Sequence, residues 1–201
     1  MRKGFFVLRT FEYNMRLILV TALAMLTFMC TAQNPKLVVG PEYNFYPAGH
    51  VFGLQGEFSP KNNHHSFNAR IAYNRTIRWN FSGLNDDERG GGPGGSIGYR
   101  YYLTPECRGL YLGARADMWF MQVRWQDSSE LVTAGTTEIN VFQPTFELGY
   151  LFHFKNGWEL GTAFTNGVEL NVKMQGEPVG EGWITLWQIR LNKRINLKSE
   201  D

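Results

Sequence analysis

The four histidines are the side chains of this sequence best suited to acid–base catalysis or metal binding, because imidazole titrates near neutral pH. They are His50, His64, His65 and His153. His64 and His65 are adjacent, so in an extended strand they point in opposite directions and cannot easily share a metal ion. His50 begins an expected strand, and no serine lies at an obvious facing position. The sequence therefore predicts no catalytic histidine, no metal site and no cofactor.

Two other segments carry reactive or ligand-binding residue types. Cys107 lies in a Pro-Glu-Cys-Arg-Gly sequence with no adjacent histidine to activate it, which indicates an unreactive thiol. The glycine-rich run from Asp86 to Gly95 lacks the Lys-Ser/Thr pair and the strand–loop–helix context of a phosphate-binding loop. We therefore expect this run to be a mobile surface loop.

Carboxylates and arginines recur on one face of the expected strands. Arg115 and Asp117 are neighbours two residues apart on that face, and structural pairing is a better explanation of them than catalysis. All of the bases on this face are arginines, which suit bidentate and partly desolvated ion pairs. We call the whole set the lumenal charge network; it comprises Glu42, Glu57, Arg70, Arg78, Arg100, Arg115, Asp117, Glu147, Glu159, Glu169 and Arg190.

The elements that carry these side chains are predicted to be strands, because apolar and polar residues alternate with a period of two. Ile97, Tyr99, Tyr101 and Leu103, for example, share one face, and Arg100 lies on the other. From the third connection onward, long and short connections alternate, with the long ones at 82–95, 126–137 and 173–182 expected outside the cell. The eight predicted strands are 36–46, 50–58, 66–79, 96–103, 109–125, 138–154, 157–172 and 183–195.

The predicted fold class is all-β, an eight-stranded antiparallel up-and-down transmembrane β-barrel. Alternation alone also fits a soluble, lipocalin-like barrel, in which the apolar face points inward. The nearly balanced charged face and the aromatic residues near strand ends favour the membrane barrel. The expected lipid-interface aromatics are Tyr43, Phe45, Trp79, Tyr99, Tyr101, Trp158, Trp183 and Trp187.

Arg75 is the exception on the apolar face. An arginine at the bilayer midplane costs about 2–4 kcal/mol, so we expect Arg75 to lie near the outer headgroups. There it could contact a lipid phosphate, a hypothesis that Arg75→Ala would test through altered lipopolysaccharide binding.

The first 32 of the 201 residues have the pattern of a secretion signal. Leu17 to Met29 is an apolar run of about 13 residues, too short for a membrane-spanning helix. Arg16 supplies a positive flank, and residues 30–32 supply the cleavage site. We expect a signal peptide at 1–32 with the true start at Met15, and a barrel domain at 33–201. The formal net charge of +2 shows no basic excess that would indicate a nucleic-acid partner.

The sequence from Gly98 to Pro105, followed by that from Gly109 to Ala114, resembles small outer-membrane β-barrel proteins of Bacteroidota, which are porin-like and akin to the OmpA/OmpX type. The resemblance implies export to the bacterial outer membrane and insertion by the outer-membrane assembly machinery. It also implies contact with outer-membrane lipid and lipopolysaccharide. Such barrels commonly end in an aromatic residue, whereas here the last strand ends near Ile195 and a polar tail follows.

The expected function is therefore that of a monomeric, non-enzymatic outer-membrane barrel. Side chains should fill its lumen, since eight strands enclose little more space than side chains occupy. External loops would serve surface recognition, adhesion or envelope integrity. Two alternatives remain: a lipid-modifying enzyme on the same barrel, which requires a His–Ser or His–carboxylate cluster open to the outer leaflet, or an exported soluble barrel that binds an apolar ligand.

Overall fold

The computed structural model describes residues 35–60, 64–79, 85–127, 133–176 and 178–196. The expected signal peptide lies outside these residues. A short 3₁₀ turn, η1, spans Lys155–Gly157, and all other regular structure is strand. The strands are β1 Lys36–Tyr46, β2 Gly49–Ser59, β3 His65–Trp79, β4 Asp87–Thr104, β5 Arg108–Asp127, β6 Thr133–His153, β7 Trp158–Gln175 and β8 Gly182–Asn196.

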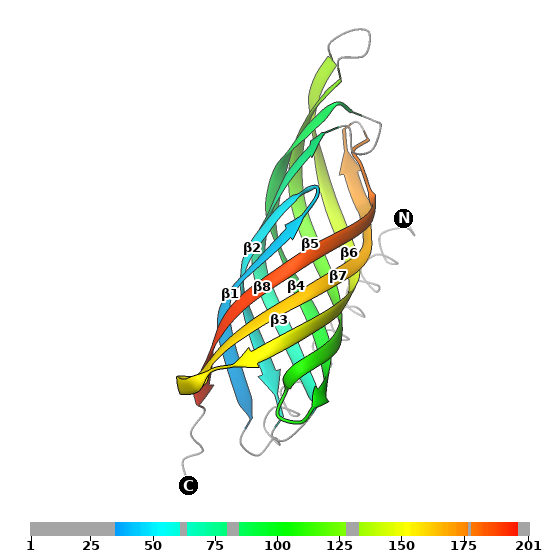
Figure 1. The fold of residues 1–201 in the computed structure, drawn as a ribbon. Coiled ribbons are helices and arrows are strands. Elements are labelled where there is room, and N and C mark those ends of the chain that lie inside the picture. The colour runs from blue at the N-terminus through cyan, green and yellow to red at the C-terminus, as the bar shows by residue number, and fades with distance from the viewer. Residues whose placement is uncertain (1–34, 61–63, 80–84, 128–132, 177, 197–201) are drawn as a thin grey trace, which may run out of the picture.

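The strands form one closed barrel in which each pairs antiparallel with its neighbours in sequence (Figure 1). β1 closes the barrel against β8, with Glu42 opposite Arg190. The predicted fold class is thus confirmed. No helix in the described part of the chain is long and apolar enough to cross a membrane.

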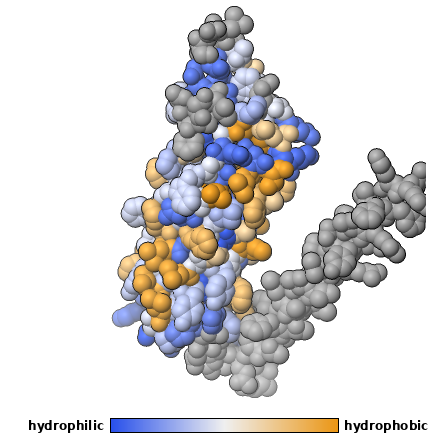
Figure 2. All heavy atoms as spheres, turned by 90° about the vertical axis from the view of Figure 1, so that its right-hand side faces the viewer, coloured by the Kyte–Doolittle hydropathy of each residue, from blue (hydrophilic) through white to orange (hydrophobic). Residues whose placement is uncertain are grey.

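The barrel wall is apolar outside and polar inside. Phe146 and Ile71 are 76% and 72% exposed on the outside, whereas Arg100 and Arg190 are 0% and 1% exposed inside. On the face shown in Figure 2, apolar side chains form patches along the barrel wall, and hydrophilic residues gather toward the upper end. This polarity is that of a transmembrane barrel and the inverse of the lipocalin-like alternative, which it contradicts.

The two ends of the barrel differ in height. We call the end that carries the β1–β2, β3–β4, β5–β6 and β7–β8 connections the outer end, and the opposite end the inner end. The β1–β2 hairpin turns at Pro47 and Ala48, well short of the tips of β5 and β6, which are 20 and 21 residues long (Figure 1). The outer rim is therefore low at β1–β2 and high at β4–β6.

The glycine-rich run is strand and not loop, which corrects the prediction for 82–95. β4 begins at Asp87, and Gly90, Gly92 and Gly94 face inward within it. A Cβ on Gly94 would overlap the indole of Trp119 on β5. Glycine is therefore needed here because a neighbouring strand fills the space that a side chain would take. The other two expected loops are also shorter than predicted, because β5 extends to Asp127 and β7 to Gln175.

An apolar belt surrounds the barrel and ends at a defined level. The outward residues of β5 from Leu110 to Phe120 are apolar, and the next two are Gln122 and Arg124. This apolar stretch has the length of roughly 9–11 residues that a tilted strand needs to cross a bilayer. On β3 the polar residue Arg75 follows Tyr73 on the outward face, and Ile77 and Trp79 continue that face beyond it. The strands continue beyond the belt as a rib that projects from the outer end.

Candidate functional site

The middle of the lumen is occupied by interlocked ion pairs. Arg70 on β3 donates to Glu42 on β1 and to Asp117 on β5. Arg115 also contacts both acids, with its Nε 3.1 Å from Asp117 Oδ2 and its Nη1 3.2 Å from Glu42 Oε1. These side chains come from strands on different sides of the barrel. The contacts therefore cross-link the wall through its interior.

A second group of ion pairs continues the network toward the inner end. Arg100 Nη1 lies 2.7 Å from Glu57 Oε2, and its Nε lies 2.9 Å from Glu147 Oε2. Arg115 Nη1 joins the two groups at 3.0 Å from Glu147 Oε1. Arg190 on β8 is 3.7 Å from Glu57 and donates to the hydroxyls of Tyr102 and Tyr111. Four arginines thus face four carboxylates, so the central lumen is electrically neutral.

Two smaller charge clusters lie above and below this centre. Toward the outer end, Arg78 donates to Glu169 and lies 3.5 Å from Glu88. At the inner mouth, Glu159 accepts from Lys36 at 2.7 Å and Arg194 at 3.2 Å. The structure places every member of the lumenal charge network inside and buried. Glu88 is an additional buried partner that the sequence analysis missed, since it lies in the run expected to be a loop.

Apolar side chains fill the lumen above the central ion pairs. Trp119, Met121 and Val141 are among a cluster of buried residues beneath the outer end. The β7–β8 connection covers this cluster by placing Val179 into it. The Gly180 carbonyl accepts from Arg78 Nη1 at 2.5 Å, and its N–H donates to Glu88 at 3.3 Å. The 173–182 connection therefore folds partly into the mouth, in contrast to the exposed loop that was expected.

The four histidines lie at three separate places in the barrel, since only His64 and His65 are neighbours. His50 faces outward, with its Nδ1 2.8 Å from the hydroxyl of Tyr43. His64 and His65 bond to the carbonyl of Tyr102 and to the hydroxyl of Tyr99, respectively. His153 lies at the inner mouth, 3.5 Å from Glu159. None of these partners is a serine, and no group of three His, Cys, Asp or Glu in the described chain could hold a metal ion.

Cys107 is buried in the turn between β4 and β5, where its thiol donates to the carbonyl of His65 at 3.5 Å. Burial raises the pKa of the thiol to about 11. The reactive thiolate is then scarce at neutral pH.

We expect Cys107 in the folded Cys30→Ser chain to react with iodoacetamide at pH 8 more than about a hundredfold more slowly than in denaturant. Because the folded pKa is raised, the rate should climb with pH until about 11. The rates are measured by mass spectrometry of the alkylated chain. The control is Arg108→Cys in a Cys30→Ser, Cys107→Ser chain, where the exposed thiol should react freely. Equal rates in the folded and unfolded chains would contradict the prediction.

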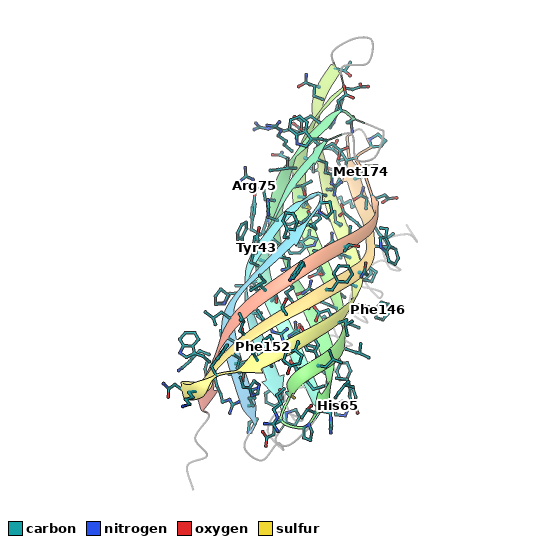
Figure 3. All side chains as sticks on the ribbon, viewed as in Figure 1. Tyr43, His65, Arg75, Phe146, Phe152 and Met174 are labelled. Atoms are coloured by element: carbon teal, nitrogen blue, oxygen red, sulfur yellow. The ribbon has the colours of Figure 1, made fainter. Side chains whose placement is uncertain are left out.

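The expected interface aromatics all lie on the outside of the barrel. Tyr99, Tyr101 and Trp158 are near the inner end of their strands, and Trp187 pairs with Phe45 near the β1–β2 hairpin. Figure 3 shows Tyr43 nearer the outer end than Phe152 and His65. Trp183 begins the outer part of β8.

Trp79 differs from the other expected interface aromatics in its position along the barrel axis. It pairs with Asp87 at the tip of β3, and Asp87 pairs with Gln126 of β5, which lies beyond the polar outward residues Gln122 and Arg124. The guanidinium of Arg89 lies 4.6 Å from the centre of its ring. Trp79 therefore stands on the projecting rib and not at the edge of the belt.

Comparisons with known proteins show the fold and no closer relationship. No family model matches the chain, and no curated protein matches it. Its structure is similar to that of a major outer membrane protein from Thermus thermophilus, at a TM-score of 0.55 and 13% identity, over 81% of this chain and 100% of that one.

Two further solved structures are similar to this chain at lower TM-scores. The N-terminal β-barrel domain of Pseudomonas aeruginosa OprF has a TM-score of 0.42 and 10% identity over 80% of this chain and 98% of that one. Ail, the attachment invasion locus protein of Yersinia pestis, in complex with the heparin analogue sucrose octasulfate, has a TM-score of 0.43 and 7% identity over 81% and 98%.

Proposed function

We propose that this chain is a small, monomeric, non-enzymatic barrel of the bacterial outer membrane, with a closed lumen and an external rib that serves surface recognition or envelope integrity. The inverted polarity of the wall carries the proposal. Closed barrels and helices are the structures that satisfy every backbone polar group within lipid. An apolar belt on a closed barrel, with paired charges inside, meets that requirement. The fold shared with the Thermus outer membrane protein supports the same location.

Because the lumen is filled, we infer a role other than bulk diffusion of solutes through the barrel. Trp119, Tyr102, Tyr111 and Arg100 are all 0% exposed, and Val179 covers the apolar layer at the outer end. Charged, aromatic and apolar layers therefore succeed one another along the axis. Function then resides on the surfaces that the barrel presents, which are the outer wall at headgroup level and the projecting rib.

The same arrangement argues against the alternative of a lipid-modifying enzyme. General-base catalysis requires a base within hydrogen-bond reach of the group that it activates. His153 does lie beside a carboxylate, but at the inner mouth, opposite to the outer leaflet. His50 faces the outer half of the wall, where its neighbours are the rings of Tyr43, Phe45 and Phe52.

A heat-modifiability gel tests the proposed membrane barrel. Because the closed hydrogen-bonded wall resists SDS until it is boiled, we expect unboiled and boiled chains to migrate at different positions. The chain should also sediment with membranes after lysis without detergent. Identical mobility together with recovery in the soluble fraction would contradict the proposal.

A separate prediction follows from the closed lumen. Proteoliposomes that contain the chain should swell in isotonic sugar no faster than protein-free liposomes, because side chains block the path along the axis. A porin reconstituted in parallel provides the positive control. Swelling that depends on sugar size would show an open channel.

A further inference from the structure

A shallow groove runs across the outside of the barrel at the outer edge of the apolar belt. It has a volume of about 360 Å³ and extends from β3 to β6. β4 forms its floor, because Gly91 and Pro93 present no large side chain outward, while Tyr73 and Phe120 stand on the flanking strands. A Cβ on Gly91 would lie only 3.0 Å from the Tyr73 ring. The groove therefore depends on glycine on this outward face.

The groove is apolar on one side and polar on the other. Pro93 and Phe120 lie on the side of the belt, Gln122 and Glu138 pair with each other on the side of the rib, and Asn140 lies opposite Phe120. A ligand that fits both sides has an apolar part within the membrane and a hydrogen-bonding part above it. Glu138 and Asn140 offer acceptors suited to sugar hydroxyls.

Three outward arginines surround the outer side of this groove. Arg75 pairs with Gly91 in the sheet register, and Arg89 lies directly opposite Arg124 across β4 and β5. Arg89 has a counterion in Asp87 at 2.9 Å. Arg75 and Arg124 form no ion pair with any residue that the structure describes. Like charges directly opposite in a sheet are destabilising, and an anion bound between them would remove that cost.

We propose that this groove and its three arginines bind a phosphorylated glycolipid of the outer leaflet. The phosphate lies against Arg75, Arg89 and Arg124, the sugar hydroxyls face Glu138 and Asn140, and an acyl chain follows Phe120 into the belt. Arginine binds phosphate through paired, charge-assisted hydrogen bonds. The proposal rests on the membrane location proposed above, and it gives the outer wall a defined ligand.

The level of the arginines favours a lipid over a soluble anion. Arg75 pairs with Gly91, and Gly91 pairs with Gln122, the first polar outward residue of β5 beyond the apolar belt; this register places Arg75 where headgroups begin (Figure 3). Arg89 and Arg124 lie opposite each other, two residues farther out along β4 and β5 than Gly91 and Gln122, so the three charges occupy two successive levels. A soluble anion would make no use of the apolar side of the groove, which is continuous with the belt.

The test is binding of bisphosphorylated lipid A to the purified full chain in neutral detergent, measured by native mass spectrometry. The triple variant Arg75→Gln, Arg89→Gln, Arg124→Gln should raise the Kd by about tenfold or more, because charge-assisted hydrogen bonds to phosphate are lost. The matched control is Arg108→Gln, Lys155→Gln, Lys193→Gln, which removes the same charge at the inner end and should leave the Kd unchanged. Gln122→Trp, which fills the groove without altering charge, should also weaken binding.

Three outcomes would overturn the inference. Equal weakening by both triple variants would show attraction by net charge alone. Equal affinity for dephosphorylated lipid A would remove the role assigned to the arginines. Full competition by inorganic phosphate at matched concentration would show a site for soluble anions. The heat-modifiability gel is run on each variant, so a failure of the barrel itself is distinguished from a failure of lipid binding.

Discussion

Replacement of Arg100 by methionine is expected to lower the free energy of unfolding by about 3–5 kcal/mol, because it leaves the buried carboxylates of the central lumen one counterion short. Arg100 is 0% exposed and contacts both Glu57 and Glu147. Glu57 would then keep the hydrogen bonds from Ser66 and Tyr102, and its remaining ion-pair partner among the described residues would be Arg190, at 3.7 Å. The loss is measured by urea unfolding in lipid vesicles, followed by tryptophan fluorescence. Arg108→Met, at an exposed position at the start of β5, should change the unfolding free energy by less than about 1 kcal/mol.

A double variant separates charge balance from packing. Removal of Arg100 and Glu147 together, as Arg100→Met and Glu147→Gln, leaves three arginines facing three carboxylates in the central lumen. The double variant should therefore be more stable than Arg100→Met alone, since the uncompensated charge is gone. If the double variant loses as much unfolding free energy as Arg100→Met and Glu147→Gln lose in sum, the ion pairs do not act as a neutral unit, and this account of the lumen is wrong.

Gly92→Ala is expected to impair barrel formation. The loss of folding free energy should be near the top of the range of roughly 1–3 kcal/mol that overpacking costs. A Cβ at Gly92 would overlap the backbone carbonyl of Phe120 on β5, and the backbone cannot move aside as a flexible side chain can. The readout is the fraction of chain that shows the folded, heat-modifiable band after refolding into vesicles.

Gly56→Ala is the matched control for that experiment. Its Cβ would meet nothing closer than 3.9 Å, so the same chemical change should leave the folded fraction unaltered. Equal loss in both variants would point to a general effect of alanine for glycine in strands. It would remove the explanation that β4 carries glycine because β5 approaches it closely.

The alternation of side chains made most of the wall predictable from sequence. In a strand the side-chain period is two, so a single parity assignment places every residue of a segment inside or outside. Glu42, Arg70 and Arg100 were assigned to the lumen on this basis, and the structure buries all three. The first strand, at 36–46, has the predicted bounds.

The glycine-rich part of β4 could not be predicted in the same way. Glycine has no side chain, so the run before Ser96 carries no alternation from which a strand could be recognised. Its strand structure depends on pairing with β3 and β5. For the same reason, Glu88 could not be recognised from the sequence as a lumenal residue. The insertion of Val179 depends on contacts between Arg78 and Gly180, which are far apart in the sequence. Long-range contacts of this kind leave no local pattern.

The orientation of the wall is tested most directly by spin labels at outward positions of β5, in a chain whose own cysteines are replaced by serine. Single labels at Leu112, Ala114, Ala116 and Met118 should be more accessible to oxygen, which partitions into lipid, than to a water-soluble nickel chelate. At Gln122, beyond the apolar belt, the preference should reverse, because the level of the headgroups has been passed. Labels at 114 and 116 that the nickel chelate reaches as freely as the label at 122 would show water around the wall and contradict the transmembrane barrel.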